Sequence, residues 1–174
     1  MKNYSIKELA TLIGTTFNEN GLDAVLVGGA CVSIYSSNKF MSFDLDLVSN
    51  APIKDIEIVL KKINFYKEGK YFRHSDSEFF IDIVSPPVAI GEELITTFNK
   101  VKTKLGEINL LTPLDCVKDR LAAFYHWDDN QSLIQAQSIF NKLLTKTDLK
   151  TIETWSKSEN HLKKFEDFKK DLKL

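Results

Sequence analysis

The chain has 174 residues, of which 23 are lysine or arginine and 24 are aspartate or glutamate, so its formal net charge is −1. A hydrophobic fraction of 43% and a charged fraction of 27% are typical of a folded globular protein and exclude disorder over most of its length. Nucleic-acid coats bind by neutralising phosphates with lysine and arginine, so this charge balance also argues against a general role of that kind.

Two cysteines, Cys31 and Cys116, stand far apart and outside any metal-binding spacing, which is typical of a protein from a reducing compartment. The first residues, MKNYSIKELA, contain no apolar segment of the secretory type. No apolar stretch approaches the roughly 20 residues of a membrane span. We therefore expect a cytoplasmic protein without a membrane partner.

The first half of the chain predicts alternating helices and strands. Ser5 and Glu8 form a capping box before apolar residues that recur with the period of a helix. A short apolar run then meets Gly28-Gly29, which we expect to form a turn between a strand and a helix. The elements expected in this half are a helix over 5–18, a strand over 24–27, a helix over 30–36, a strand over 43–48 and a helix over 52–63.

Later segments predict further strands and then helices alone. FYKEGKYFRH predicts a hairpin, EFFIDIVS a strand that Pro86-Pro87 stops, and KVKTKLGEINLLT two more strands. Thr112, followed by proline, caps the first of the remaining helices. The sequence thus predicts an α+β fold, with a mixed-sheet core and flanking helices over residues 1–111 and an α-helical part over residues 112–174.

An Asp-x-Asp pair interrupts the expected strand over 43–48. Residues two apart in a strand point to the same face, so Asp44 and Asp46 project together while Leu45 and Leu47 take the other side. Two adjacent carboxylates repel each other, and burial raises the cost, so a cation between them would explain the pair. Ligands that offer only oxygen favour Mg²⁺ or Mn²⁺ over zinc.

Gly28-Gly29 offers a place for phosphate near that pair. Glycine lets the backbone approach a ligand closely, and free N–H groups at a helix N-terminus attract phosphate. A third acid, Asp82, lies inside the apolar run FFIDIVS, where a carboxylate is costly unless it is paired or bound to a metal. This set suits metal-assisted phosphoryl-type transfer, in which two ions clamp the attacking and leaving oxygens.

The order Gly-Gly, then Asp-x-Asp on the following strand, then a lone Asp on a later strand resembles the nucleotidyltransferase superfamily of the DNA polymerase beta type. The segments that carry the resemblance are VGGACV, SFDLDLV and FFIDIVSPP. In addition, LLTPLDCVKDRLAAFYHWDDNQSLIQA is similar to a helical segment of small bacterial and phage-defence members related to AbiEii-type toxins. The resemblance spans about residues 23–140.

The resemblance assigns roles to the three acids. Asp44, Asp46 and Asp82 would bind the catalytic ions, Mg²⁺ or Mn²⁺. Asp82 would also take the proton of the attacking hydroxyl group.

The phosphate contacts that the resemblance implies fall to Gly28, Gly29 and Lys118. The two glycines would cradle the β- and γ-phosphates of a nucleoside triphosphate, although the second position is often serine in the family. Lys118, on the first C-terminal helix, would reach the triphosphate. The residues also allow a plainer interpretation, in which Lys118 lies on an exposed face and pairs with Asp115 or Asp119 at helical spacing.

The implied activity is metal-dependent transfer of a nucleoside monophosphate from NTP to an acceptor hydroxyl, with release of pyrophosphate. For an AbiEii-like toxin the acceptor would be RNA, such as tRNA, or a protein, and an antitoxin would be its partner. Two alternatives stay open: a nucleotidyltransferase that modifies a small molecule such as an antibiotic, and a non-catalytic binding or antitoxin module that keeps the fold.

Overall fold

The computed structural model of the protein describes residues 1 and 3–173. The chain folds into two compact units, one made of Met1–Val88 with Phe98–Leu111 and the other of Ala89–Thr97 with Thr112–Leu174. The last change from one unit to the other falls between Leu111 and Thr112. The segment Ala89–Thr97 precedes that change in the sequence but folds with the helices.

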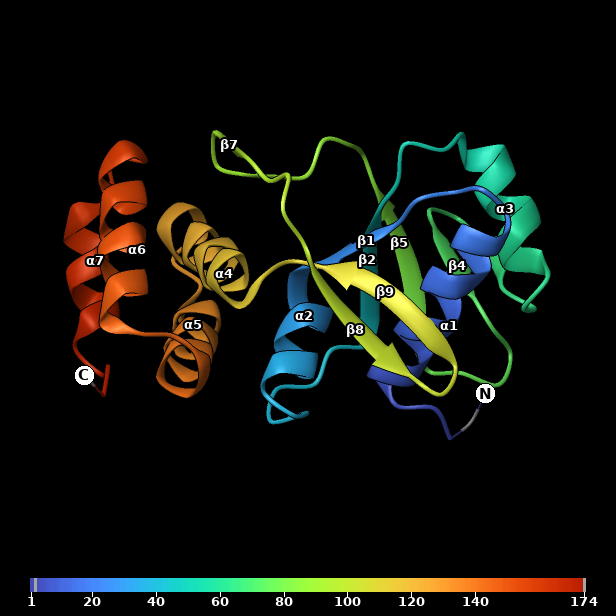
Figure 1. Ribbon diagram of the computed structural model, residues 1–174, viewed down its shortest axis with the longest axis horizontal. Coiled ribbons are helices and arrows are strands. Elements are labelled where there is room, and N and C mark those ends of the chain that lie inside the picture. The colour runs from blue at the N-terminus through green and yellow to red at the C-terminus, as the bar shows by residue number, and fades with distance from the viewer. Residues whose placement is uncertain (2, 174) are drawn as a thin grey trace. The chain divides into compact units, whose positions relative to one another are not determined.

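The first unit is a mixed β-sheet with helices, as Figure 1 shows. Its elements are α1 (Ile6–Glu19), β1 (Val25–Val27), α2 (Gly28–Tyr35), β2 (Asp44–Val48), α3 (Ile53–Lys61), β3 (Tyr66–Glu68), β4 (Tyr71–Arg73), β5 (Phe80–Val84), β8 (Asn99–Thr103) and β9 (Gly106–Leu110). The strand order is β3-β4-β5-β2-β1-β9-β8. The pairs β1–β9 and β2–β5 are parallel, and the other neighbours are antiparallel. This is the α+β class that the sequence predicts.

Helix α1 begins at the predicted cap. The Ser5 hydroxyl oxygen accepts a hydrogen bond from the Glu8 N–H at 3.2 Å, and the Glu8 carboxylate accepts one from the Ser5 N–H at 3.1 Å. Leu9, Ile13 and Phe17 are fully buried, and the helix packs against β9 and β8. The predicted apolar stripe is therefore the side of α1 that faces the sheet.

The strands β2 and β5 have two different faces. Leu45, Leu47 and Ile81 are fully buried in the core. The aspartates that alternate with them are half-buried. The sheet thus buries one face of these strands and presents carboxylates on the other.

One prediction about α2 was wrong. The sequence predicts a glycine turn followed by a helix over 30–36, whereas α2 begins at Gly28 itself. Val27 is still extended, with φ −128° and ψ −175°, and Gly28 makes the bend within one residue at φ +67°. The two glycines therefore form the first turn of α2.

The second unit is mainly helical. Its elements are β6 (Ala89–Ile90), β7 (Glu93–Leu94), α4 (Pro113–Trp127), α5 (Asn130–Leu143), α6 (Lys146–Ser158) and α7 (Leu162–Lys169). Thr112 caps α4 as predicted, because its hydroxyl oxygen accepts from the Asp115 N–H at 3.1 Å. β6 and β7 pair as a small antiparallel hairpin, which was not predicted. Across the residues that the structure describes, no helix has both the length and the apolar character needed to cross a membrane.

Gly14 lets α1 approach β9 closely. A Cβ at this position would lie 2.5 Å from the Glu107 carbonyl oxygen and 2.6 Å from Ile108 Cβ. We expect Gly14→Ala to lower the free energy of unfolding by about 1–3 kcal/mol, because helix and strand must separate, although alanine is the better helix former. Asn18→Ala, at an exposed position of α1, should change the free energy of unfolding by less than about 0.5 kcal/mol. Urea unfolding followed by circular dichroism measures both, and a stabilised Gly14→Ala protein would contradict this packing.

Candidate functional site

Strands β2 and β5 lie side by side in the sheet (Figure 1). Their pairing brings the three predicted acids to one face. In this parallel pair Asp46 is the register partner of Asp82, and Asp44 is that of Phe80. Side chains alternate along each strand, so Asp44, Asp46 and Asp82 share one side. Neighbouring strands are about 4.8 Å apart. Three carboxylates from two separate segments therefore meet on one half-buried surface.

Asp44 is held by Ser42. The Ser42 hydroxyl donates a short hydrogen bond to Asp44 Oδ1 and lies 3.3 Å from the Asp44 carbonyl oxygen. The same hydroxyl oxygen is 3.0 Å from the position that a Cβ of Gly29 would take. Ser42 therefore lies between the first turn of α2 and the first acid of β2. No sequence motif marks this serine, because its position follows from how the chain returns from α2 to β2.

Gly28 borders the second acid. Its φ of +67° belongs to the region that residues with a Cβ rarely adopt. A Cβ there would also collide with Asp46 Oδ2. The adjoining residue, Val27, pairs with Asp46 across β1 and β2. The glycine bend thus lies beside the acids, as predicted, and the contact of Gly28 and Gly29 with phosphate stays a prediction.

Asp82 forms an ion pair that was not predicted. Lys70 Nζ lies 2.9 Å from Asp82 Oδ2. The lysine follows Gly69 in the turn between β3 and β4, and its side chain is 66% exposed, against 22% for Asp82. The hydrogen bond to Asp82, followed by one to Tyr71, raises the pKa of Lys70 above its ordinary value. Lys70 therefore places a positive charge at the edge of the acid surface.

The donor chemistry of the acid surface suits a hard divalent cation. Asp44, Asp46 and Asp82 offer oxygen ligands alone, which Mg²⁺ and Mn²⁺ prefer. Among residues 1 and 3–173, however, no group of three or more His, Cys, Asp and Glu side chains is arranged to hold a metal ion. Asp82 binds the Lys70 ammonium group instead. An ion that binds Asp82 Oδ2 therefore competes with Lys70 for that oxygen.

Lys118 belongs to the other unit and is 3% exposed. Its Nζ lies 2.7 Å from Glu93 Oε2 on β7 and 3.9 Å from Asp115 Oδ1 one helical turn away. The expected pairing with Asp115 is thus present, but the expected exposed position is not, because Lys118 also pairs with the hairpin β6–β7. Contact of Lys118 with a triphosphate stays a prediction.

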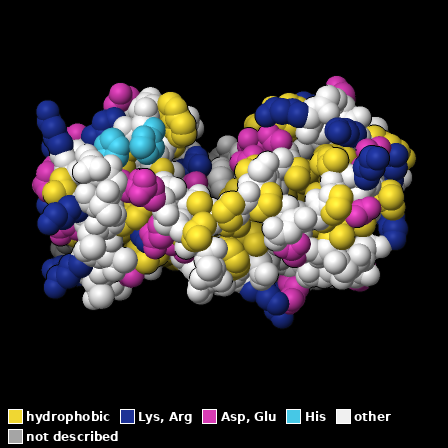
Figure 2. All heavy atoms as spheres, turned by 90° about the horizontal axis from the view of Figure 1, so that it is seen from above, with side chains coloured by type: hydrophobic (Ala, Val, Ile, Leu, Met, Phe, Trp, Pro, Cys, Tyr) yellow, Lys and Arg dark blue, Asp and Glu magenta, His cyan; other side chains and the backbone are white. Residues whose placement is uncertain are grey.

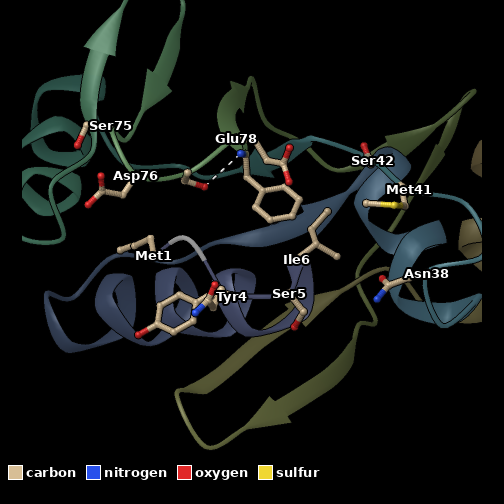
Figure 3. Close-up of a pocket in the computed structure, with 13 residues that line it drawn as sticks. Met1, Tyr4, Ser5, Ile6, Asn38, Met41, Ser42, Ser75, Asp76 and Glu78 are labelled. Atoms are coloured by element: carbon tan, nitrogen blue, oxygen red, sulfur yellow. Dashed lines mark hydrogen bonds between the residues drawn. The ribbon is translucent and has the colours of Figure 1, made fainter.

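Ser42 also borders a cavity of about 680 Å³ (Figure 3). In Figure 3 Ser42 and Met41 lie at the α2 side of this cavity, and Asp76 lies among the residues of the loop before β5. The lining residues come from the N-terminal segment and from the loops that precede β2 and β5: Met1, Asn3, Tyr4, Ser5, Ile6, Asn38, Met41, Ser42, Ser75, Asp76, Ser77, Glu78 and Phe79. The three acids of the candidate site are not part of this lining. The cavity therefore adjoins the acid surface through Ser42 and is distinct from it.

The surface charge is mixed. On the face that Figure 2 shows, lysine and arginine side chains are dispersed and acidic side chains lie among them. This face therefore lacks the single basic stripe that binds a long nucleic-acid backbone.

The fold has relatives among solved structures, although no protein-family model and no curated protein matches the chain. An antigenic nucleotidyltransferase-like protein from Paracoccidioides brasiliensis has a TM-score of 0.61 and 13% identity, covering 97% of this chain and 94% of its own. The antibiotic-resistance factor ANT(2'')-Ia has a TM-score of 0.57 and 11% identity in its solution structure, covering 96% and 98%. Its crystal structure in complex with adenylyl-2''-tobramycin has a TM-score of 0.52 and 12% identity, and the match covers 89% of this chain and 98% of that one. The fold is therefore that of nucleotidyltransferase-like proteins, and the AbiEii-like subgroup stays a prediction.

Gly28→Ala should damage the site more than an equally strained substitution elsewhere. Gly21 has a similar φ of +71° but nothing within 4 Å of a Cβ, so Gly21→Ala is a matched control for backbone strain. We expect Gly28→Ala to lower the free energy of unfolding by about 1–3 kcal/mol more than Gly21→Ala, because its methyl group displaces Asp46. Parallel denaturant titrations measure the difference. Equal losses in the two variants would show that Asp46 does not pack against Gly28.

Proposed function

We propose that the protein is a metal-dependent nucleotidyltransferase that moves a nucleoside monophosphate from NTP to an acceptor hydroxyl. The observation that carries this proposal is the register of β2 and β5, which sets Asp46 opposite Asp82 with Asp44 on the same face. The glycine bend beside Asp46 and the likeness of the fold to nucleotidyltransferase-like proteins support it further.

The three acids have separable tasks in this reaction. Together Asp44, Asp46 and Asp82 would hold Mg²⁺ or Mn²⁺, which supplies positive charge to the phosphates. Asp82 accepts the proton of the acceptor hydroxyl. The acceptor oxygen then forms a bond to the α-phosphorus, the bond between that phosphorus and the bridging oxygen breaks, and pyrophosphate leaves.

The first turn of α2 provides the phosphate contacts in this proposal. Gly28 and Gly29 bring backbone N–H groups to a helix N-terminus, where anions bind favourably. The position of Gly29 leaves room for the Ser42 hydroxyl, which orients Asp44.

The acceptor we propose first is RNA, such as tRNA, or a protein, as in AbiEii-type toxins with an antitoxin partner. A small-molecule acceptor is the second candidate. It is favoured by the fold likeness to ANT(2'')-Ia, an antibiotic-resistance factor whose crystal structure holds an adenylylated antibiotic. A non-catalytic module with the same fold is the third.

Asp46→Asn should abolish transfer of label from α-³²P-labelled NTP while leaving the fold intact, because the substitution removes one charge between the other two acids. A loss of at least about a hundredfold is expected, as for other interactions made with developing charge. Asp76→Asn removes an exposed carboxylate of the same unit and should retain full labelling. Undiminished labelling by Asp46→Asn, with an unchanged circular dichroism spectrum, would refute the assignment.

The acceptor can be identified in the same assay by offering total tRNA, cell-extract protein and tobramycin separately. We expect label in the tRNA or protein fraction, together with growth arrest on expression that Asp46→Asn relieves. Label in tobramycin alone would establish the small-molecule enzyme. Failure to bind Mg²⁺ and NTP in calorimetry would favour the non-catalytic module.

A further inference from the structure

We propose that Lys70 is a built-in counter-cation of the acid site, which a divalent ion must displace from Asp82 in order to bind. Lys70 would thus be a positioning residue that sets the metal affinity of the site. The inference rests on the proposed function, because it assumes that the three acids hold a metal ion.

Electrostatic repulsion explains why such a residue is needed. Asp46 and Asp82 are register partners on neighbouring strands, and Asp44 shares their face. Carboxylates on adjacent positions of neighbouring strands repel each other, and the repulsion is stronger where they are half-buried. Lys70 Nζ lies 2.9 Å from Asp82 Oδ2 and neutralises one of these charges. Without metal, the lysine therefore lowers the cost of keeping three acids on one face.

The position of Lys70 makes the ion pair easy to break. The side chain is 66% exposed, and ion pairs in solvent contribute little to stability. The preceding Gly69 has a φ of +62° and nothing within 4 Å of a Cβ, so the turn is open around it. β3 is an edge strand, so the hairpin tip can release Lys70 without disturbing a central strand.

Lys70 also contacts an aromatic ring while it pairs with Asp82. Its Nζ lies 4.6 Å from the centroid of the Tyr71 ring, within the range of a cation–π contact. A divalent ion carries twice the charge of the ammonium group and offers ligand positions to all three acids. Exchange of one cation for the other therefore leaves Asp82 neutralised.

A permanent structural ion pair is the competing explanation. In that case Lys70 would only fasten the hairpin β3–β4 to β5, and its removal would loosen Asp82 and weaken metal binding. Displacement predicts the opposite sign, because removal of a competing cation strengthens metal binding. The sign of the change in metal affinity therefore separates the two explanations.

The test measures the binding of Mn²⁺ to the full chain in the absence of nucleotide. Electron paramagnetic resonance and calorimetry each give the Kd. We expect Lys70→Gln to lower the Kd for Mn²⁺ roughly two- to fivefold, the range that an exposed ion pair is worth. Lys67→Gln is the matched control, because it removes the same charge from an exposed position of the same hairpin. It should leave the Kd nearly unchanged. In an Asp82→Asn background, Lys70→Gln should no longer change the Kd.

Thermal unfolding provides a second readout. Lys70→Gln should lower the Tm in the absence of metal, and Mn²⁺ should raise the Tm of this variant by more than it raises that of the unmodified protein.

Three results would count against the proposal. If Lys70→Gln binds Mn²⁺ with the same Kd as Lys67→Gln, or with a higher Kd, the displacement proposal is overturned. The proposed function survives that result as long as Asp46→Asn abolishes Mn²⁺ binding. If the unmodified protein binds no Mn²⁺ at millimolar concentration, both this inference and the proposed function fall.

Discussion

The in-register parallel pairing of β2 with β5 is the constraint on which the candidate site depends. Leu45 and Leu47 on one strand and Ile81 on the other are fully buried, so the core fixes which face of each strand points inward. A slip of one residue would turn apolar side chains outward and carboxylates into the core. Ordinary hydrophobic packing therefore forces Asp46 and Asp82 onto the same half-buried face. The acid surface is a consequence of the same alternation that builds the core.

That arrangement creates a problem of charge, which neighbouring residues reduce without removing. Ser42 donates a hydrogen bond to Asp44, and Lys70 forms an ion pair with Asp82. Both contacts come from segments outside β2 and β5, one from the connection after α2 and one from a hairpin tip. A surface held in this way attracts cations while remaining open to solvent.

Sequence patterns predicted the parts of the structure that local rules determine. The capping box at Ser5 and the alternation around Asp46 each fix an element or a face within a few residues, and both predictions agree with the structure. The α+β class followed from the order of such elements. The start of α2 at Gly28 was missed, because a single residue with positive φ performs the bend for which a longer turn was expected.

The features that sequence patterns could not predict depend on contacts between distant segments. The strands β6 and β7 are two residues long and carry no periodic signal, so neither the hairpin nor the burial of Lys118 beneath Glu93 could be foreseen. In the same way, Lys70 reads as an ordinary turn lysine until β4 is paired with β5. The acids of the candidate site could thus be identified from the sequence alone. The ion pairs of Lys70 with Asp82 and of Lys118 with Glu93 could be identified only from the tertiary structure.

The most direct measurement of the central claim is a crystal structure with Mn²⁺ and a non-hydrolysable NTP, in which the manganese is located by its anomalous scattering. The account predicts manganese bound by oxygens of Asp44, Asp46 and Asp82, with the triphosphate against the first turn of α2. Nucleotide and manganese bound elsewhere, with Asp82 still paired to Lys70, would contradict it.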